Sequence, residues 1–160
     1  MVFKTPNFTN SSGFTLVELI VSVGIIMVLA TSALLYSNIA QDKSKSRDLV
    51  RFSDLAYLES AISQYIMVEK TCPDNSSLLR VSDTVPSGST FGWLVEDLTD
   101  YIPKLPIDPI NNLTYRYSYF CFGVDYEINA NLEHFVDKEV SDGGNNVDVF
   151  ETGTNLTLIN

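Results

Sequence analysis

The chain has 160 residues, of which 45% are hydrophobic, and its formal net charge at pH 7 is -10. This length provides for one small domain and leaves no room for a separate catalytic domain. Twenty acidic residues stand against ten basic ones. Because binding to a phosphate backbone needs clustered Lys and Arg, the composition disfavours nucleic acid as a partner.

The first thirteen residues, MVFKTPNFTNSSG, are polar and rich in residues that favour turns. They precede a long apolar stretch, and we interpret residues 1–13 as a detachable leader. A conventional secretory signal has a shorter apolar core and a small-residue cleavage site. The nearest candidate site, Thr31-Ser32-Ala33, lies deep inside a longer apolar run, so cleavage by ordinary signal peptidase is disfavoured.

Residues 14–40 form an apolar stretch without proline. As a helix it would rise about 40 Å, which is enough to cross a hydrocarbon core of about 30 Å. Gly24 is its only glycine, and the missing side chain allows another backbone to approach closely. The pattern predicts a transmembrane helix over residues 14–40.

Glu18 is the only acidic or basic side chain between residues 5 and 41. An ionised carboxylate that faces lipid costs on the order of 3 kcal/mol, so it favours a partner. One interpretation places Glu18 in the headgroup region, where the positive end of the helix dipole stabilises it. The other gives it a cationic partner from a second chain.

The segment Gly13-Phe14-Thr15-Leu16-Val17-Glu18, after a short leader and before an apolar helix, closely resembles the processing site of type IV pilins and type II secretion pseudopilins. The resemblance implies that prepilin peptidase cuts after Gly13 and methylates the new terminal amine of Phe14. It also implies that Glu18 pairs with the Phe14 amine of a neighbouring subunit. Such a pair would set the register of assembly, because a slipped subunit leaves both charges unpaired.

The helix is predicted to continue over residues 41–71, because no Pro or Gly occurs between Ile25 and Cys72. Apolar residues recur at steps of three and four, which is the pattern of a helix that packs one face on a domain. We expect this packed face to comprise Leu49, Phe52, Leu55, Leu58, Ile62, Tyr65 and Ile66. The exposed face is expected to carry Asp48, Arg51, Asp54 and Glu59.

Basic residues Lys43, Lys45 and Arg47 follow the apolar stretch. Taken alone, the positive-inside rule would put the C-terminal domain in the cytoplasm. Processing of the leader at the cytoplasmic face requires the opposite orientation, and we favour the topology that the resemblance implies. Contact of the basic residues with lipid headgroups is the simpler account of their position.

Residues 72–160 are predicted to form a globular head. Residues 73–90 are predicted to form a loop with a short strand at Leu78 to Val81. Residues Gly92 to Ile102 are predicted to form a short amphipathic helix that buries Trp93. Three prolines in residues 103–109 favour an extended connection. Alternating residues in 113–122 and 126–132 predict two antiparallel strands of a hairpin.

The segment Leu105-Pro106-x-Asp108-Pro109, followed by an Asn pair and alternating Tyr, resembles the segment that opens the sheet of major pseudopilins and related pilins. Where that family has Trp-Gly-Asn-Pro-Tyr, this chain has Ile110-Asn111-Asn112-Leu113-Thr114-Tyr115. Major pseudopilins also hold calcium in a C-terminal loop. In this chain Asp142 and Asp148, in an oxygen-rich loop with a Gly pair, are candidate calcium ligands; ordinary turn chemistry is the alternative.

Cys72 and Cys121 are the only cysteines. In an exported domain they can form a disulfide between the end of the long helix and the sheet, worth roughly 4 kcal/mol in the chain-entropy model. In a reduced domain they are small buried apolar groups. Both possibilities stay open at the level of sequence.

No phosphate-binding loop, His-Cys cluster or catalytic triad signature occurs, and His134 is the only histidine. We therefore predict a non-enzymatic protein of the α+β class, with a long N-terminal helix packed on a small antiparallel sheet in a pilin-like arrangement. No cofactor is required. The resemblance implies a filament subunit in the cytoplasmic membrane, whose head lies outside. Its implied partners are further pilins, prepilin peptidase, an assembly ATPase and a platform protein. The alternative function is a single-span, membrane-anchored binding module that does not polymerise.

Overall fold

The computed structural model describes residues 13–89 and 91–160. It contains two compact units, which divide between Ala40 and Gln41. The predicted leader, residues 1–13, lies outside the described part of the chain except for Gly13.

Helix α1 begins at Leu16 and ends at Glu69. In the first unit, its segment Leu16–Leu34 is long and apolar enough to cross a membrane, and none of that segment is buried inside the protein. The helix ends two residues before residue 71, the predicted bound. Lys70 adopts a left-handed backbone conformation with φ 60°, which is typical of the residue after a helix, and Cys72-Pro73 follows.

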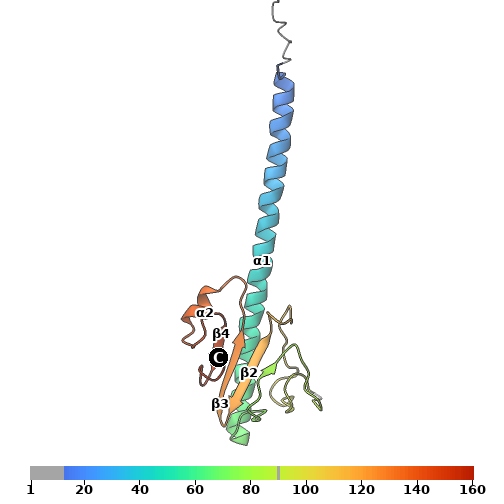
Figure 1. The fold of residues 1–160 in the computed structure, drawn as a ribbon. Coiled ribbons are helices and arrows are strands. Elements are labelled where there is room, and N and C mark those ends of the chain that lie inside the picture. The colour runs from blue at the N-terminus through green and yellow to red at the C-terminus, as the bar shows by residue number, and fades with distance from the viewer. Residues whose placement is uncertain (1–12, 90) are drawn as a thin grey trace, which may run out of the picture. The chain divides into compact units, whose positions relative to one another are not determined.

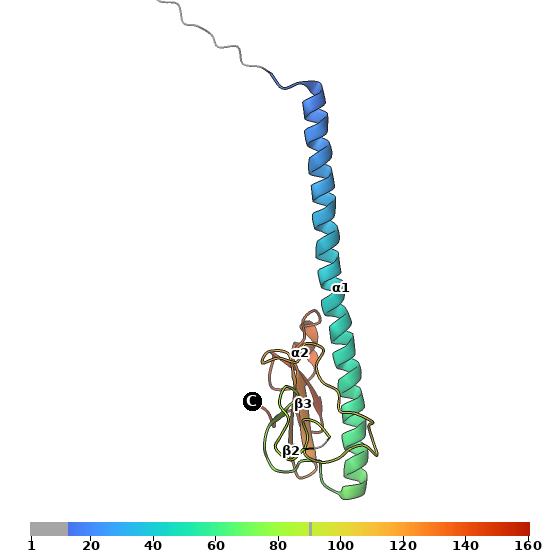
Figure 2. The same ribbon diagram turned by 90° about the vertical axis from the view of Figure 1, so that its right-hand side faces the viewer.

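The second unit is the head, in which four antiparallel strands follow chain order across one sheet. The strands are β1 (Arg80–Val81), β2 (Tyr117–Phe122), β3 (Asp125–Ala130) and β4 (Phe150–Gly153). Figures 1 and 2 show β2 and β3 alongside the part of α1 that belongs to this unit. The α+β class predicted from sequence is confirmed.

One face of the sheet and the second half of α1 form the core. Alternate residues of β2 and β3 are buried against the helix, as the two-residue period predicts. The core comprises Leu55, Leu58, Ala61 and Ile62 of α1 with Tyr117, Tyr119, Cys121, Tyr126, Ile128 and Ala130 of the sheet. Trp93 is buried with them, as predicted, and its Nε1 donates a hydrogen bond to the Pro106 carbonyl at 2.8 Å.

The predicted helix over residues 92–102 is wrong. These residues form bends and turns, although Leu94, Leu98 and Ile102 are buried as the spacing suggested. The Ser89 hydroxyl bonds the carbonyls of Gly92 and Leu94, and Gly92 has φ 148°. Local side-chain bonds and a non-helical glycine therefore replace the helical ladder.

Other element boundaries also differ from the prediction. The strand expected from residue 113 begins at Tyr117, and Leu113 is exposed. Helix α2 (Asp137–Ser141) and strand β4 were missed. Leu49, which was assigned to the packed face of α1, is exposed.

Candidate assembly site

The candidate assembly site is the start of α1. Thr15 precedes the first helical residue, and its side-chain oxygen accepts a hydrogen bond from the Glu18 backbone N–H at 3.2 Å. A Thr followed three residues later by Glu is the pattern of a capping box. Thr15 therefore fixes where the helix begins, and it places the Glu18 carboxylate in the first turn, where the helix dipole favours negative charge.

Three hydroxyl side chains in the described part of the apolar segment are satisfied within their own helix. The hydroxyls of Ser22, Thr31 and Ser32 each donate to the carbonyl four residues earlier, at 2.6, 2.7 and 2.8 Å. Such bonds allow a hydroxyl to lie in a lipid environment without a further partner. Among the described residues of this segment, Glu18 is the one charged side chain, and its charge needs a partner from outside the helix.

Phe14 and the apolar side chains from Leu16 to Leu34 are exposed, and Phe14 is 75% exposed. Residues 8–34 match the model of the prokaryotic N-terminal methylation motif. The chain carries the signal motif of type IV pilins and pseudopilins. No curated protein and no solved structure matches the chain at a significant level.

The pilin signal motif supports a type IV pilin-like or pseudopilin subunit. The family that carries this motif is structural. It supports prepilin-type cleavage and methylation, and the apolar helix supports a membrane span. Gly13 and Phe14 are thus the residues on which processing would act.

In the head, the segment around Asp108 is attached to α1 through a buried arginine. Arg51 is 0% exposed. Its Nε and Nη2 donate to the two carboxylate oxygens of Asp108 at 2.6 and 3.0 Å, and its Nη1 donates to Asp48 and Glu133, both at 2.7 Å. The prediction that Asp48 and Arg51 lie on an exposed face is therefore wrong, because their charges are paired inside the head.

The same network folds a loop over the helix. The Asp48 carboxylate accepts hydrogen bonds from the backbone N–H groups of Glu133, His134 and Phe135 at 2.7–3.1 Å. Burial opposes its ionisation, but these bonds and the one from Arg51 hold the pKa of Asp48 below its usual range. Hydrogen bonds from Arg47 and Arg51 likewise lower the pKa of Glu133. Asp48 and Glu133 therefore stay ionised at neutral pH.

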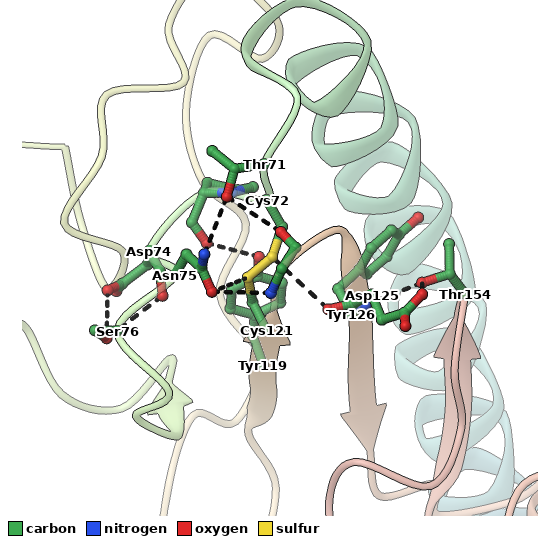
Figure 3. Close-up of a disulfide and its surroundings, with 12 residues drawn as sticks. Thr71, Cys72, Asp74, Asn75, Ser76, Tyr119, Cys121, Asp125, Tyr126 and Thr154 are labelled. Atoms are coloured by element: carbon green, nitrogen blue, oxygen red, sulfur yellow. Dashed lines mark hydrogen bonds between the residues drawn. A yellow bond between two sulfur atoms is a disulfide. The ribbon is translucent and has the colours of Figure 1, made fainter.

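A disulfide joins Cys72, just after α1, to Cys121 on β2, with the two Cα atoms 6.3 Å apart (Figure 3). Two hydrogen bonds accompany it at the β2–β3 turn. The Cys72 N–H donates to the Gly123 carbonyl at 2.9 Å, and the Gly123 N–H donates to Asn75 Oδ1 at 3.0 Å. The Thr71 hydroxyl also donates to the Gly123 carbonyl at 3.1 Å, so the segment that follows the long helix is tied to the sheet by one covalent bond and several hydrogen bonds.

Several acidic side chains of the head are buried instead of solvated. Glu127 of β3 and Glu151 of β4 are buried together on the face of the sheet away from α1. Glu127 Oε2 accepts from the N–H groups of Leu158 and Ile159 at 2.7 and 2.9 Å. Burial and the neighbouring Glu127 carboxyl raise the pKa of Glu151 to about 7.

The predicted calcium ligands lie in the loop that packs on this pair. Asp142 already accepts hydrogen bonds from the N–H groups of Gly144 and Glu151, at 2.9 and 2.7 Å. Within residues 13–89 and 91–160, no three His, Cys, Asp or Glu side chains are grouped as metal ligands. Calcium at Asp142 and Asp148 stays a prediction.

The residues that sequence reasoning missed are the buried charges. Asp48 and Arg51 occur at helical neighbour spacing, and Asp108 lies between Pro106 and Pro109. Their spacing was compatible with a network, but the sequence gives no signal that Arg51 would reach Asp108, 57 residues away. His134 is exposed.

Proposed function

We propose that the chain is a structural subunit of a type IV pilus-like or type II secretion pseudopilus filament, polymerised through its N-terminal helix. The observation that carries this proposal is the combination at the start of α1. There the methylation motif runs directly into an exposed apolar helix whose sole carboxylate is Glu18.

Cleavage after Gly13 creates a positively charged amine on Phe14, four residues before Glu18. In a bundle of such helices, the Phe14 amine of one subunit pairs with Glu18 of the next. Pairing removes two charges from a low-dielectric environment together, whereas a subunit displaced along the axis leaves both charges unpaired, which costs several kcal/mol. The pair therefore selects one axial register.

Before assembly, the apolar helix holds the subunit in the cytoplasmic membrane, with the leader inside and the head outside. An assembly ATPase and a platform protein then extract it into a filament in the periplasm or at the cell surface. Apolar side chains that faced lipid come to face the helices of neighbouring subunits, so little apolar area is exposed to water during the transfer.

The processing step is tested by mass spectrometry of the intact protein purified from its native host. We expect a mature chain that starts at N-methyl-Phe14. A Gly13→Leu variant, which places a large side chain at the cleavage site, should keep its leader and should not assemble. A native chain that retains Met1 in a host with the peptidase would overturn the proposal and would support a membrane-anchored binding module instead.

A further inference from the structure

The head contains three copies of the tripeptide Asn-x-Ser/Thr in which x is not proline. The copies are Asn75-Ser76-Ser77, Asn112-Leu113-Thr114 and Asn155-Leu156-Thr157. This tripeptide is the acceptor for N-linked glycosylation in exported proteins. The sugar is attached to the amide nitrogen of Asn, and the transferring enzyme recognises the hydroxyl two residues later. Because so short a pattern also occurs by chance, the surroundings of each copy decide whether it can react.

The first copy is committed to the fold. Asn75 Nδ2 donates a hydrogen bond to the Thr71 hydroxyl at 3.1 Å, and Asn75 Oδ1 accepts one from the Gly123 N–H at 3.0 Å (Figure 3). Both ends of this amide therefore hold the segment that carries the disulfide, and a sugar on Nδ2 would displace it.

The third copy is also engaged. The Thr157 hydroxyl donates to Asn155 Oδ1 at 2.8 Å, and Asn155 is half-buried. The next two N–H groups, of Leu158 and Ile159, are bound by the buried Glu127 carboxylate at 2.7 and 2.9 Å. The hydroxyl that an enzyme would have to recognise is thus already paired, in a segment held on the sheet.

The middle copy lies in an exposed turn. The Asn112 N–H donates to the Tyr115 carbonyl at 2.9 Å, and Asn112 Oδ1 accepts from the N–H groups of Thr114 and Tyr115, both at 2.9 Å. In such a turn the side-chain oxygen of Asn replaces a backbone acceptor. Asn112, Leu113 and Thr114 are all exposed, and Leu113 is 82% exposed. The turn therefore presents the whole tripeptide to solvent.

The turn uses only the oxygen of the Asn112 amide. Within the described part of the chain, neither Asn112 Nδ2 nor the Thr114 hydroxyl has a hydrogen-bond partner. These are the two groups that glycosylation requires. Asn112 thus differs from Asn75, whose nitrogen is paired, and from Asn155, whose hydroxyl partner is paired.

The preceding residue fixes the base of this turn. Asn111 Nδ2 donates to the Ser82 carbonyl at 3.1 Å, and the Ser82 hydroxyl donates to Asn111 Oδ1 at 2.7 Å. The Asn111 N–H donates to Asp108 Oδ1 at 3.2 Å. One Asn of the pair therefore binds the head, and the other, Asn112, can carry a bulky group without the loss of any hydrogen bond of the fold.

We propose that Asn112 is a site of N-linked glycosylation, with the Thr114 hydroxyl as the recognition element and a saccharide on a lipid diphosphate as the donor. Asn112 Nδ2 forms a bond to C1 of the sugar and gives up one proton to solvent. The bond between C1 and the diphosphate oxygen breaks, and its electron pair leaves with the lipid diphosphate. No oxidant or reductant takes part.

This inference rests on the proposed function, which holds the subunit in a membrane with its head outside. A lipid-linked donor lies in a membrane too, so transfer takes place before the subunit is extracted. Because a saccharide is bulky and hydrophilic, the turn at Asn112 then has to face solvent in the filament.

Mass spectrometry of the protein from its native host tests the inference. We expect the mature chain to be heavier than its sequence by at least one saccharide, and fragmentation that preserves side-chain modifications should place the added mass on Asn112. Asn112→Gln should remove all of it. Asn155→Gln, the matched control, should keep it. A wild-type chain without added mass, or with the saccharide on Thr114 or Asn155 and not on Asn112, would overturn the inference.

The hydroxyl is tested separately. Thr114→Val removes the hydroxyl with little change in volume and should abolish the modification, whereas Thr114→Ser should keep it. Both variants retain the backbone N–H that binds Asn112, and the emission of Trp93, the sole tryptophan, reports that the head is folded. Wild-type occupancy in Thr114→Val would show that the tripeptide is not what the enzyme reads, and the inference would be wrong.

The same spectra separate this inference from the function on which it rests. A chain that starts at N-methyl-Phe14, assembles and carries no saccharide refutes glycosylation and leaves the subunit function intact. A chain that keeps Met1 refutes the proposed function, and the mass on its Asn112 still decides the inference.

Discussion

The apolar half of α1 and the head differ in how their carboxylates are paired. In the head, Asp48 and Asp108 are buried, and each is paired with Arg51 and with backbone N–H groups. In the apolar segment, no basic side chain among the described residues pairs with Glu18. Carboxylates that pair with cations of their own chain stabilise the fold. A carboxylate without such a cation can pair with a cation of a neighbouring chain.

The largest effect on the head is expected from Arg51→Leu. This change leaves the buried carboxylates of Asp48 and Asp108 without their shared cation, removes one of the two cationic partners of Glu133, and should lower the free energy of unfolding by about 3–5 kcal/mol. Urea denaturation of the full chain in detergent, followed by Trp93 fluorescence, measures the change.

Arg116→Leu is the matched control for Arg51→Leu. Arg116 pairs with Asp83 at 3.0 Å, but its side chain is 29% exposed, so its loss should cost less than about 1 kcal/mol. Equal midpoints for Arg51→Leu and the wild type would show that the buried network does not stabilise the head.

The disulfide should contribute next. Replacing both Cys72 and Cys121 by Ser opens a loop that spans a sequence separation of 49 residues, and the chain-entropy model gives a loss of about 4 kcal/mol, with about 2–4 typical. The same fluorescence measurement applies. As a direct check, the protein unfolded without reductant should contain no reactive thiol, and a count of two would exclude the bond.

Glu18→Gln should leave the head unchanged and affect assembly alone. The variant is expected to insert and to be processed, but the Phe14 amine of the neighbouring subunit loses its partner. Filament yield should fall roughly a hundredfold, equivalent to about 3 kcal/mol. Ser22→Ala, which removes another polar group from the same helix, should assemble normally. Undiminished filaments from Glu18→Gln would count against charge pairing.

The smallest effect concerns pH. The pKa of Glu151 is raised to about 7 in the folded head from an ordinary value of 4.5, so folding favours its protonated form. The contribution of Glu151 to the free energy of unfolding is fully present below about pH 4.5. It is lost as the pH rises through 7, by at most about 1.4 kcal/mol per pH unit. Glu151→Gln should flatten this part of the stability profile. A profile as steep as that of the wild type would assign the dependence to other groups.

The sequence was sufficient for the elements that depend on periodicity. The apolar run, the long helix and the alternating residues of β2 and β3 each repeat with the period of their structure. Residues 92–102 show where this approach fails. Leu94, Leu98 and Ile102 have helical spacing and are buried, but Gly92 and the Ser89 hydroxyl impose turns that the spacing does not reveal.

The candidate site was predictable at the N-terminus because its residues are contiguous. The Thr15 cap is also readable from sequence, as a Thr three residues before Glu18, although it was overlooked. In contrast, the burial of Arg51 depends on Asp108 and Glu133, which come from distant parts of the chain. Charge on a helix suggests exposure, and only tertiary structure reveals a buried pair.

The covalent link between Cys72 and Cys121 has a mechanical consequence for a subunit under load. Tension that enters the head through α1 and leaves through the C-terminus passes across the sulfur bridge, so the enclosed loop, with a sequence separation of 49, cannot be drawn out. At about 3.4 Å per stretched residue, roughly 165 Å of contour length is withheld from extension. An oxidised head that is pulled apart therefore lengthens much less than a reduced one.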